Sequence, residues 1–291
     1  MSNKNQIVKP KRDSRLGDAC KRFMRNKSAM IGLVILLAII FVIIFADQIA
    51  DPELITKYDV KAKLQPPSAE HPFGTDNLGR DMFTRVIHGT RITVGIGVGA
   101  TLLSLVIGAA IATVCALSRR VDFVVMRITD VFYCIPYLLL AIVLLAILGG
   151  SVGSMMITLT LIQTPSFIIL IRSVLLGVVE QDYVKAARIS GTRGIKLVLL
   201  HILPNALDPI IVNATMTISS MLLSAAGLSF IGIGISPPSP EWGAMLNFSQ
   251  QFFKTAPHMA IFPGLAIALT ALSINLVGDG LRDALDPKST K

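Results

Sequence analysis

Six long apolar runs divide this sequence, and each is free or nearly free of charged side chains. A membrane-spanning helix needs roughly 20 mostly apolar residues to cross about 30 Å of hydrocarbon. The runs approach or exceed this length, and they cover residues 29–46, 92–117, 123–148, 153–171, about 207–235 and about 257–277. The sequence therefore predicts an all-α, polytopic membrane protein with six transmembrane helices.

The composition excludes a soluble domain of the same length. Hydrophobic residues make up 53% of the 291-residue chain, charged residues only 15%, and the mean hydropathy is +0.67. Average soluble domains carry about 25% charged residues, and a soluble fold of this size cannot bury so much apolar surface. Disorder is excluded as well, because disordered chains are poor in hydrophobic residues. Lipid must cover part of this chain.

Lysine and arginine are distributed unevenly between the two sets of loops. Twenty of the 27 fall in the terminal stretches and in the loops that share their side, and seven fall on the opposite side. Cytoplasmic loops carry the excess of these residues, so both termini are predicted to be cytoplasmic. The net charge of +9 is thus a topology signal with anionic lipid as its neighbour. Nucleic acid is not predicted as a partner.

The predicted helices organise the chain into five parts. Two connecting segments are too long to be simple connectors, and long loops often carry function. The parts are a basic cytoplasmic N-terminal tail (1–28), the first transmembrane helix (29–46), an external segment (47–91), a five-helix core (92–279) that contains the long cytoplasmic loop 172–206, and a cytoplasmic C-terminal tail (280–291).

No motif for catalysis, nucleotide hydrolysis or metal binding occurs in the sequence. Walker A, HExxH and GxSxG sequences are absent, the four histidines are isolated, and the three cysteines show no CxxC spacing. We therefore expect no catalytic residue, cofactor or metal on this chain. A self-sufficient secondary transporter is the alternative from a different class. It usually needs ionisable groups near the midplane, and the predicted spans hold almost none there.

The long cytoplasmic loop has the pattern of a helix-turn-helix. Residues 180–190 place acidic side chains early and basic ones late, as the helix dipole favours, and Gly191 supplies a C-terminal stop. A second short helix is expected over about 194–201, ending before Pro204. The small side chains of Ala186 and Ala187 would let another surface approach closely. The pattern indicates a projecting knob that acts on a partner, with an ordinary connector as the alternative.

This loop resembles the EAA loop of ABC-importer permeases. In that motif Glu-Ala-Ala is followed after three residues by Gly, and after nine more by Ile, any residue, Leu and Pro. Lys185 replaces the Glu and His201 the Ile, changes that resemble the peptide-transporter branch of the family. The resemblance implies an ATPase-coupling loop that contains Tyr183, Lys185, Ala186, Ala187, Arg188, Gly191, His201, Leu203 and Pro204.

Three further stretches resemble dipeptide and oligopeptide permeases of the C-subunit type. They are the external entry to the second span at 71–91, the fifth-span exit at 228–243 and the end of the last span at 275–287. The external stretch supplies a second group of candidate residues, namely Phe73, Gly74, Asp76, Gly79, Arg80 and Asp81. These residues either fold the loop over the pore or contact a binding protein or substrate.

The resemblance implies the type I ABC importer permease fold and half of a translocation pore. The implied partners are a homologous second permease, two ATP-binding cassette subunits that hold ATP and Mg, an extracytoplasmic substrate-binding protein and membrane lipid. The implied location is the plasma (inner) membrane of a bacterium or archaeon. The implied cargo is di- or oligopeptides, and related permeases for nickel or glutathione are the alternative.

Overall fold

A computed structural model describes residues 15–285, and its regular elements in that range are all helical. Five stretches are long and apolar enough to cross a membrane: α2 (Lys27–Ile49), α3 (Met82–Leu117), α6 (Val152–Val179), Gly194–Phe230, which ends with α9 (Leu203–Phe230), and α11 (His258–Leu285). A sixth crossing results if α4 (Arg119–Cys134) and α5 (Tyr137–Leu148) count as one bent span. The all-α fold is confirmed, and the number of spans agrees with the predicted six when the bent pair is counted as one.

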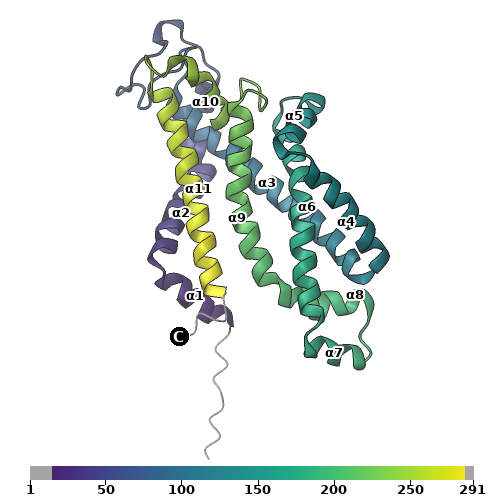
Figure 1. Cartoon of the computed structure of the whole chain (residues 1–291). Helices are drawn as coiled ribbons and strands as arrows, with labels where there is room; N and C mark the ends of the chain where they lie inside the picture. Colours follow the sequence, from purple (N-terminus) through teal and green to yellow (C-terminus); the bar gives the residue numbers. More distant parts are fainter. Residues whose placement is uncertain (1–14, 286–291) are drawn as a thin grey trace, which may run out of the picture.

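The two ends of the helical bundle carry different elements (Figure 1). At one end lie α1 (Arg15–Arg25), α7 (Asp182–Ile189), α8 (Gly194–Leu197) and the C-terminal end of α11. The opposite end carries α10 (Trp242–Ser249) and the segment between α2 and α3. We call them the α7 end and the α10 end. The two long loops predicted from the sequence therefore lie at opposite ends of the molecule.

The long helix α3 packs against both α6 and α9. Glycines make this possible, since small residues let membrane helices approach closely. A Cβ added to Gly97 would stand 3.1 Å from the Cβ of Leu222 in α9, and one added to Gly108 would stand 2.7 Å from the Cβ of Phe167 in α6. Buried apolar clusters lie along the bundle from the α10 end to the α7 end.

The second span begins ten residues before its predicted start at residue 92. Asp81 caps the helix by accepting a 2.8 Å hydrogen bond from the backbone N–H of Thr84. The first turns of α3 contain polar residues, so hydropathy alone predicts that they belong to the external segment. They are helical because the described external segment and α10 bury them. At the N-terminus, α1 lies within the predicted tail 1–28. At the other terminus, α11 extends into the predicted tail 280–291. The outer parts of both tails lie outside the described residues.

The third predicted span, 123–148, is not one straight helix. α4 and α5 are bent by 92° at Ile135 and Pro136. Proline has no N–H to donate and disfavours helical geometry in the residue before it. Ile135 accordingly has extended backbone angles. The hydropathy of the apolar run does not predict this break between α4 and α5, because hydropathy carries no information on backbone geometry.

The helix after Gly191 was predicted to end before Pro204, and this was wrong. The chain continues from α8 through a π-helical turn (Val198–Ile202) into α9. Pro204 directly follows the π turn, in the first turn of α9, so the altered hydrogen-bond pattern there accommodates a residue that has no N–H. The widened π turn thus lets one continuous helical stretch connect the short α8 to a full span.

Candidate functional site

The predicted knob at the α7 end is a short helix with a well-defined stop. Gly191 has a φ of +92°, and its N–H donates to the carbonyl of Arg188 at 3.0 Å. The N–H of Thr192 donates to the carbonyl of Ala187, also at 3.0 Å. These two bonds define a Schellman motif. The predicted role of Gly191 as a C-terminal stop is confirmed.

One face of α7 fixes the knob to the bundle. Val184 is fully buried in a cluster with Leu175 of α6, Leu197 of α8 and Ile202 of the π turn. Burying a side chain of this size stabilises the contact by about 1.5–3 kcal/mol. Because the cluster joins α6, α7 and the helix leading into α9, movement of the knob would move the ends of two spans.

The predicted coupling residues divide into two groups. Ala187, His201 and Leu203 are partly buried, whereas the exposed group contains Tyr183, Lys185, Ala186, Arg188, Gly191 and Pro204. Lys185 lies 3.1 Å from Asp182 in an exposed ion pair, and such pairs contribute little stability.

The exposed face of α7 is also apolar in part. Ile189, three residues after Ala186, is 87% exposed, and Ile195 of α8 is exposed as well. Large apolar side chains exposed on a projecting element are available for contact with a partner. The arrangement is a rigid projection with a small-residue and apolar face, and it carries no reactive group.

The external motif is organised around Asp76. Its Oδ2 accepts a 2.6 Å hydrogen bond from Nε of Arg80, and its Oδ1 accepts bonds from the backbone N–H groups of Leu78 (2.8 Å) and Arg80 (2.9 Å). Nε of Arg85 lies 3.9 Å from the same Oδ2. Asp76 and Arg80 are each only 3% exposed. Two buried guanidinium groups therefore share one carboxylate, which compensates only part of their positive charge.

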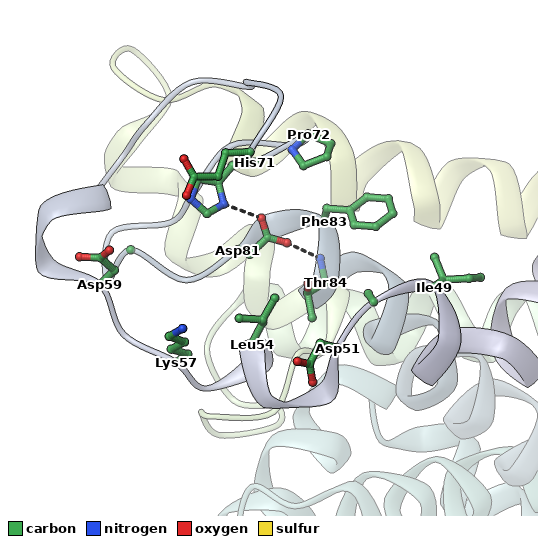
Figure 2. A pocket seen from close by; sticks show the side chains of 13 residues that line it. Ile49, Asp51, Leu54, Lys57, Asp59, His71, Pro72, Asp81, Phe83 and Thr84 are labelled. Atoms are coloured by element: carbon green, nitrogen blue, oxygen red, sulfur yellow. Dashed lines mark hydrogen bonds and ion pairs between the residues drawn. The ribbon is translucent and has the colours of Figure 1, made fainter.

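Asp81 connects the external segment to the start of α3 (Figure 2). Its Oδ1 lies 2.9 Å from Nδ1 of His71, and its Oδ2 accepts the capping bond from Thr84. The side chains of Asp81 and His71 line a cavity of about 400 Å³, together with those of Asp51 and Lys57. Asp81 therefore has a structural role as a helix cap beside this cavity.

Phe73 and the two glycines of the motif attach the segment to its surroundings. The Phe73 ring stacks on Phe262 of α11, with centroids 3.9 Å apart and planes within 2°. Gly74 (φ +75°) packs so closely that an added Cβ would stand 2.7 Å from the His258 ring. At Gly79 (φ +78°) an added Cβ would stand 1.8 Å from the carbonyl oxygen of Asp59. Neither position can accept a side chain without a shift of the neighbouring backbone or ring.

The structure brings the six external residues together at the α10 end, far from the coupling residues. Their contacts are with other parts of this chain, and most of the motif is buried. This geometry favours the interpretation that the motif folds the external segment over the bundle. Contact with a binding protein or substrate stays a prediction.

The chain is similar in sequence to known families of proteins. A family model described as "Binding-protein-dependent transport system inner membrane component" matches residues 83–291, well over half of the sequence. The chain belongs to this family of transport permeases. A second model, described as "N-terminal TM domain of oligopeptide transport permease C", matches residues 14–67. The resemblance inferred from the loop motifs is thus confirmed.

Several curated relatives match the permease over nearly its whole length. "Dipeptide transport system permease protein DppC" of Alkalihalophilus pseudofirmus is 40% identical, covering 93% of this chain and 89% of that relative. "Glutathione transport system permease protein GsiD" of Escherichia coli is 42% identical, covering 92% and 89%.

A solved structure supports the fold independently. The chain is similar to one in "Inward facing conformations of the MetNI methionine ABC transporter", with a TM-score of 0.59 and 20% identity. The match covers 70% of this chain and 98% of that one. At this identity the likeness establishes the fold, which is that of a type I ABC importer permease.

A buried carboxyl group that was not singled out from the sequence caps α10 of the permease. Glu241 is fully buried, and its two oxygens accept bonds from the N–H groups of Gly243 (2.9 Å) and Ala244 (2.7 Å). The indole of Trp242 donates to the carbonyl of Val86 in α3 at 3.0 Å. Glutamate is not among the residues that usually cap helices, so the local sequence did not indicate this cap, and the burial of Glu241 depends on contacts with α3.

We predict that Glu241 makes stability pH-dependent. Burial raises the pKa of its carboxyl group, and the hydrogen bonds from Gly243 and Ala244 oppose this only in part. The folded state then holds the proton more tightly than the unfolded state, so stability falls as pH rises from the ordinary glutamate pKa through the raised one. Replacing Glu241 by Gln removes this titration. Thermal unfolding between about pH 5 and about pH 8 should show the difference in Tm moving in favour of the Gln variant as pH rises. A constant difference would contradict this.

Proposed function

We propose that this permease is one pore-forming subunit of an ATP-driven, binding-protein-dependent importer of short peptides. The observation that carries the proposal is the knob at the α7 end, anchored through Val184 to the helices that lead into two spans. A surface of this kind can receive force from a partner without performing chemistry itself. The family and the peptide permeases among its relatives support the assignment of importer and cargo.

In this proposal the α7 end faces the cytoplasm, as the Lys and Arg distribution favours. Two ATP-binding cassette subunits dock there and hold the ATP and Mg. A homologous permease completes the pore, and an extracytoplasmic binding protein delivers substrate at the α10 end. Closure of the ATPase pair pushes on the knob and turns the spans from inward-facing to outward-facing.

The ends of the spans near the knob are coupled to one another. Arg172 of α6 forms a two-point ion pair with Asp122 of α4, in which its Nη2 donates to Oδ2 at 2.6 Å. Paired contacts of this type fix orientation as well as distance. A push on α7 would therefore reach α4 as well as α6 and α9, which gives the bent span α4–α5 a route to move with the others.

Glutathione is a second candidate cargo, because relatives named as glutathione permeases match this chain at 42% identity. Glutathione is itself a small peptide, so the same subunit arrangement serves both assignments. The choice between them is expected to depend mainly on the binding protein.

The proposal is tested by purifying the tagged permease in gentle detergent from its native membrane and identifying the proteins that accompany it. A second permease and ATP-binding subunits are expected. The reconstituted complex with its binding protein should import labelled dipeptides only with ATP. A homo-oligomer that transports under an ion gradient without any ATPase would overturn the proposal and favour a secondary transporter.

A further inference from the structure

An uncharged groove, lined by apolar residues with several polar groups among them, opens at the bend between α4 and α5. It has a volume of about 440 Å³ and is bounded by the bend, by α6 near Pro165 and by α9. Its polar groups come from all three sides: Tyr133, Tyr137, Gln163, Ser166 and Ser224. No charged residue lines it. We call it the bend groove.

A second groove of about 550 Å³ continues along the same two helices toward the α7 end. It is lined by Leu170 of α6 and by residues of α9 from Met216 down to Asn205. Its charged lining residues are Asp208 and Arg282, both near the α7 end of their helices. We call it the inner groove. Charge is therefore confined to one end of the combined surface.

The two grooves together are as long as the membrane core is thick. Ser224 and Asn205 are 19 positions apart on α9, which at 1.5 Å per residue corresponds to about 28 Å. A bilayer core is about 30 Å thick. The lining residues on α9, including Met216 and Asn213, recur at helical spacing. Polar side chains on α9 therefore recur among apolar ones along the length of the span.

Lipid is a poor neighbour for the polar groups of the bend groove. Within residues 15–285, the structure gives no hydrogen-bond partner to the side chains of Gln163, Ser166 and Ser224, and all three are partly accessible. In hydrocarbon no water is present to hydrogen-bond such groups. Polar groups in spans accordingly face a protein partner or a water-filled cavity.

We infer that the bend groove and the inner groove together form this permease's share of the substrate passage. The inference rests on the proposed function and adds the chemistry of recognition. The amide of Gln163 and the hydroxyls of Ser166 and Ser224 can donate to and accept from the peptide backbone. The faces of Tyr133 and Tyr137 can pack on side chains of many kinds. The uncharged lining of the bend groove suits short peptides irrespective of side-chain charge.

Thiol labelling tests where the passage lies. Cysteines are placed at Ser166 or Ser224 in a cysteine-free parent (Cys20→Ser, Cys115→Ala, Cys134→Ser), within the full complex in its membrane. Ile169→Cys and Leu223→Cys are matched controls, because both native residues are exposed on the same helices but line neither groove. Only a thiol that ionises in water reacts with a charged methanethiosulfonate.

The groove cysteines should react at least about tenfold faster than the controls. Unreactive groove cysteines on both helices would overturn the inference, whether lipid or a packed partner covers them. This readout needs no transport. Failure of the inference is thus distinct from failure of the proposed function, which would appear as a complete wild-type importer that carries no peptide.

The chemistry of recognition has its own test. Ser224→Cys is modified with an anionic or a cationic methanethiosulfonate, and uptake of Ala-Glu and Ala-Lys is compared with that of the unmodified variant. The anionic adduct should reduce Ala-Glu uptake at least about threefold more than Ala-Lys uptake, and the cationic adduct should do the reverse, since like charges repel at short range. An adduct that changes uptake of both peptides equally would overturn the claim that cargo charge meets this surface.

Discussion

Replacing Ala186 by arginine is expected to abolish ATP-dependent uptake while the permease still folds and inserts. The Ala186 side chain is exposed on α7, and the knob is held by Val184 on the opposite face. A long charged side chain at Ala186 would therefore disturb little within the chain, but it would prevent a partner from approaching closely. A loss of about 2.7 kcal/mol in docking corresponds to a hundredfold weaker complex. Recovery of ATPase subunits in a pull-down should fall by up to about that factor, and ATP-dependent uptake in vesicles should be lost with it.

The control for this prediction is Ala186→Ser, which adds one small atom and should retain uptake and ATPase recovery. Thermal unfolding of both variants in detergent should match that of the wild type, because exposed substitutions usually change stability by under about 0.5 kcal/mol. An arginine variant that imports at the normal rate would show that the knob is not the coupling surface.

Gly191→Asp is a second variant of the knob, also expected to insert and to lose uptake. Its interpretation needs a control, because Gly191 has a φ of +92° and any side chain there adds backbone strain. Apart from the adjoining residues, no atom of the described chain lies within 4 Å of a Cβ built at this position, so a new side chain would project away from the chain. Gly191→Asn provides the control, since asparagine tolerates left-handed geometry best among the larger residues. If Asn retains uptake and Asp does not, the charge on the docking face is responsible.

The knob illustrates what sequence can predict. The dipole pattern of 180–190 and the glycine after it are local signals, and the structure has a helix with a Schellman stop at that place. The anchor Val184 gave no such signal, because its burial comes from Leu175, Leu197 and Ile202, which the fold brings together. The continuation through Pro204 was missed for a related reason. A π turn is a local backbone arrangement that no short sequence motif predicts.

Hydropathy found the spans but not their breaks or their polar faces. A window average treats residues 123–148 as one apolar run, although Pro136 divides it. The same averaging conceals Gln163, Ser166 and Ser224, since each lies among apolar neighbours in the chain. Their significance depends on α6 and α9 lying side by side, which is tertiary information. The opposite holds for the external motif. The sequence identified its residues, but only the structure shows that most of them are buried.

Asp76→Asn is expected to destabilise the α10 end by about 3–5 kcal/mol, the usual cost of leaving a buried charge without its partner. Asparagine keeps an oxygen that can accept from the backbone N–H groups of Leu78 and Arg80, so the substitution chiefly removes the charge. The guanidinium groups of Arg80 and Arg85 would then lack their shared carboxylate. Trp242 is the single tryptophan in the chain and lies buried at this end. Its fluorescence during denaturation in detergent would report the loss.

The matched control is Asp51→Asn, which makes the same chemical change at an exposed cap in the same segment. It should shift stability by under about 0.5 kcal/mol. The decisive comparison is a double-mutant cycle with Arg80→Met, which keeps much of the side-chain volume and removes the charge. If the cost of Asp76→Asn comes from an uncompensated Arg80, then Arg80→Met should recover at least about 1 kcal/mol in the Asn background. Additive losses would instead mean that Asp76 acts through the turn it caps. The external motif would then be held by backbone geometry at Gly74 and Gly79 rather than by its buried charges.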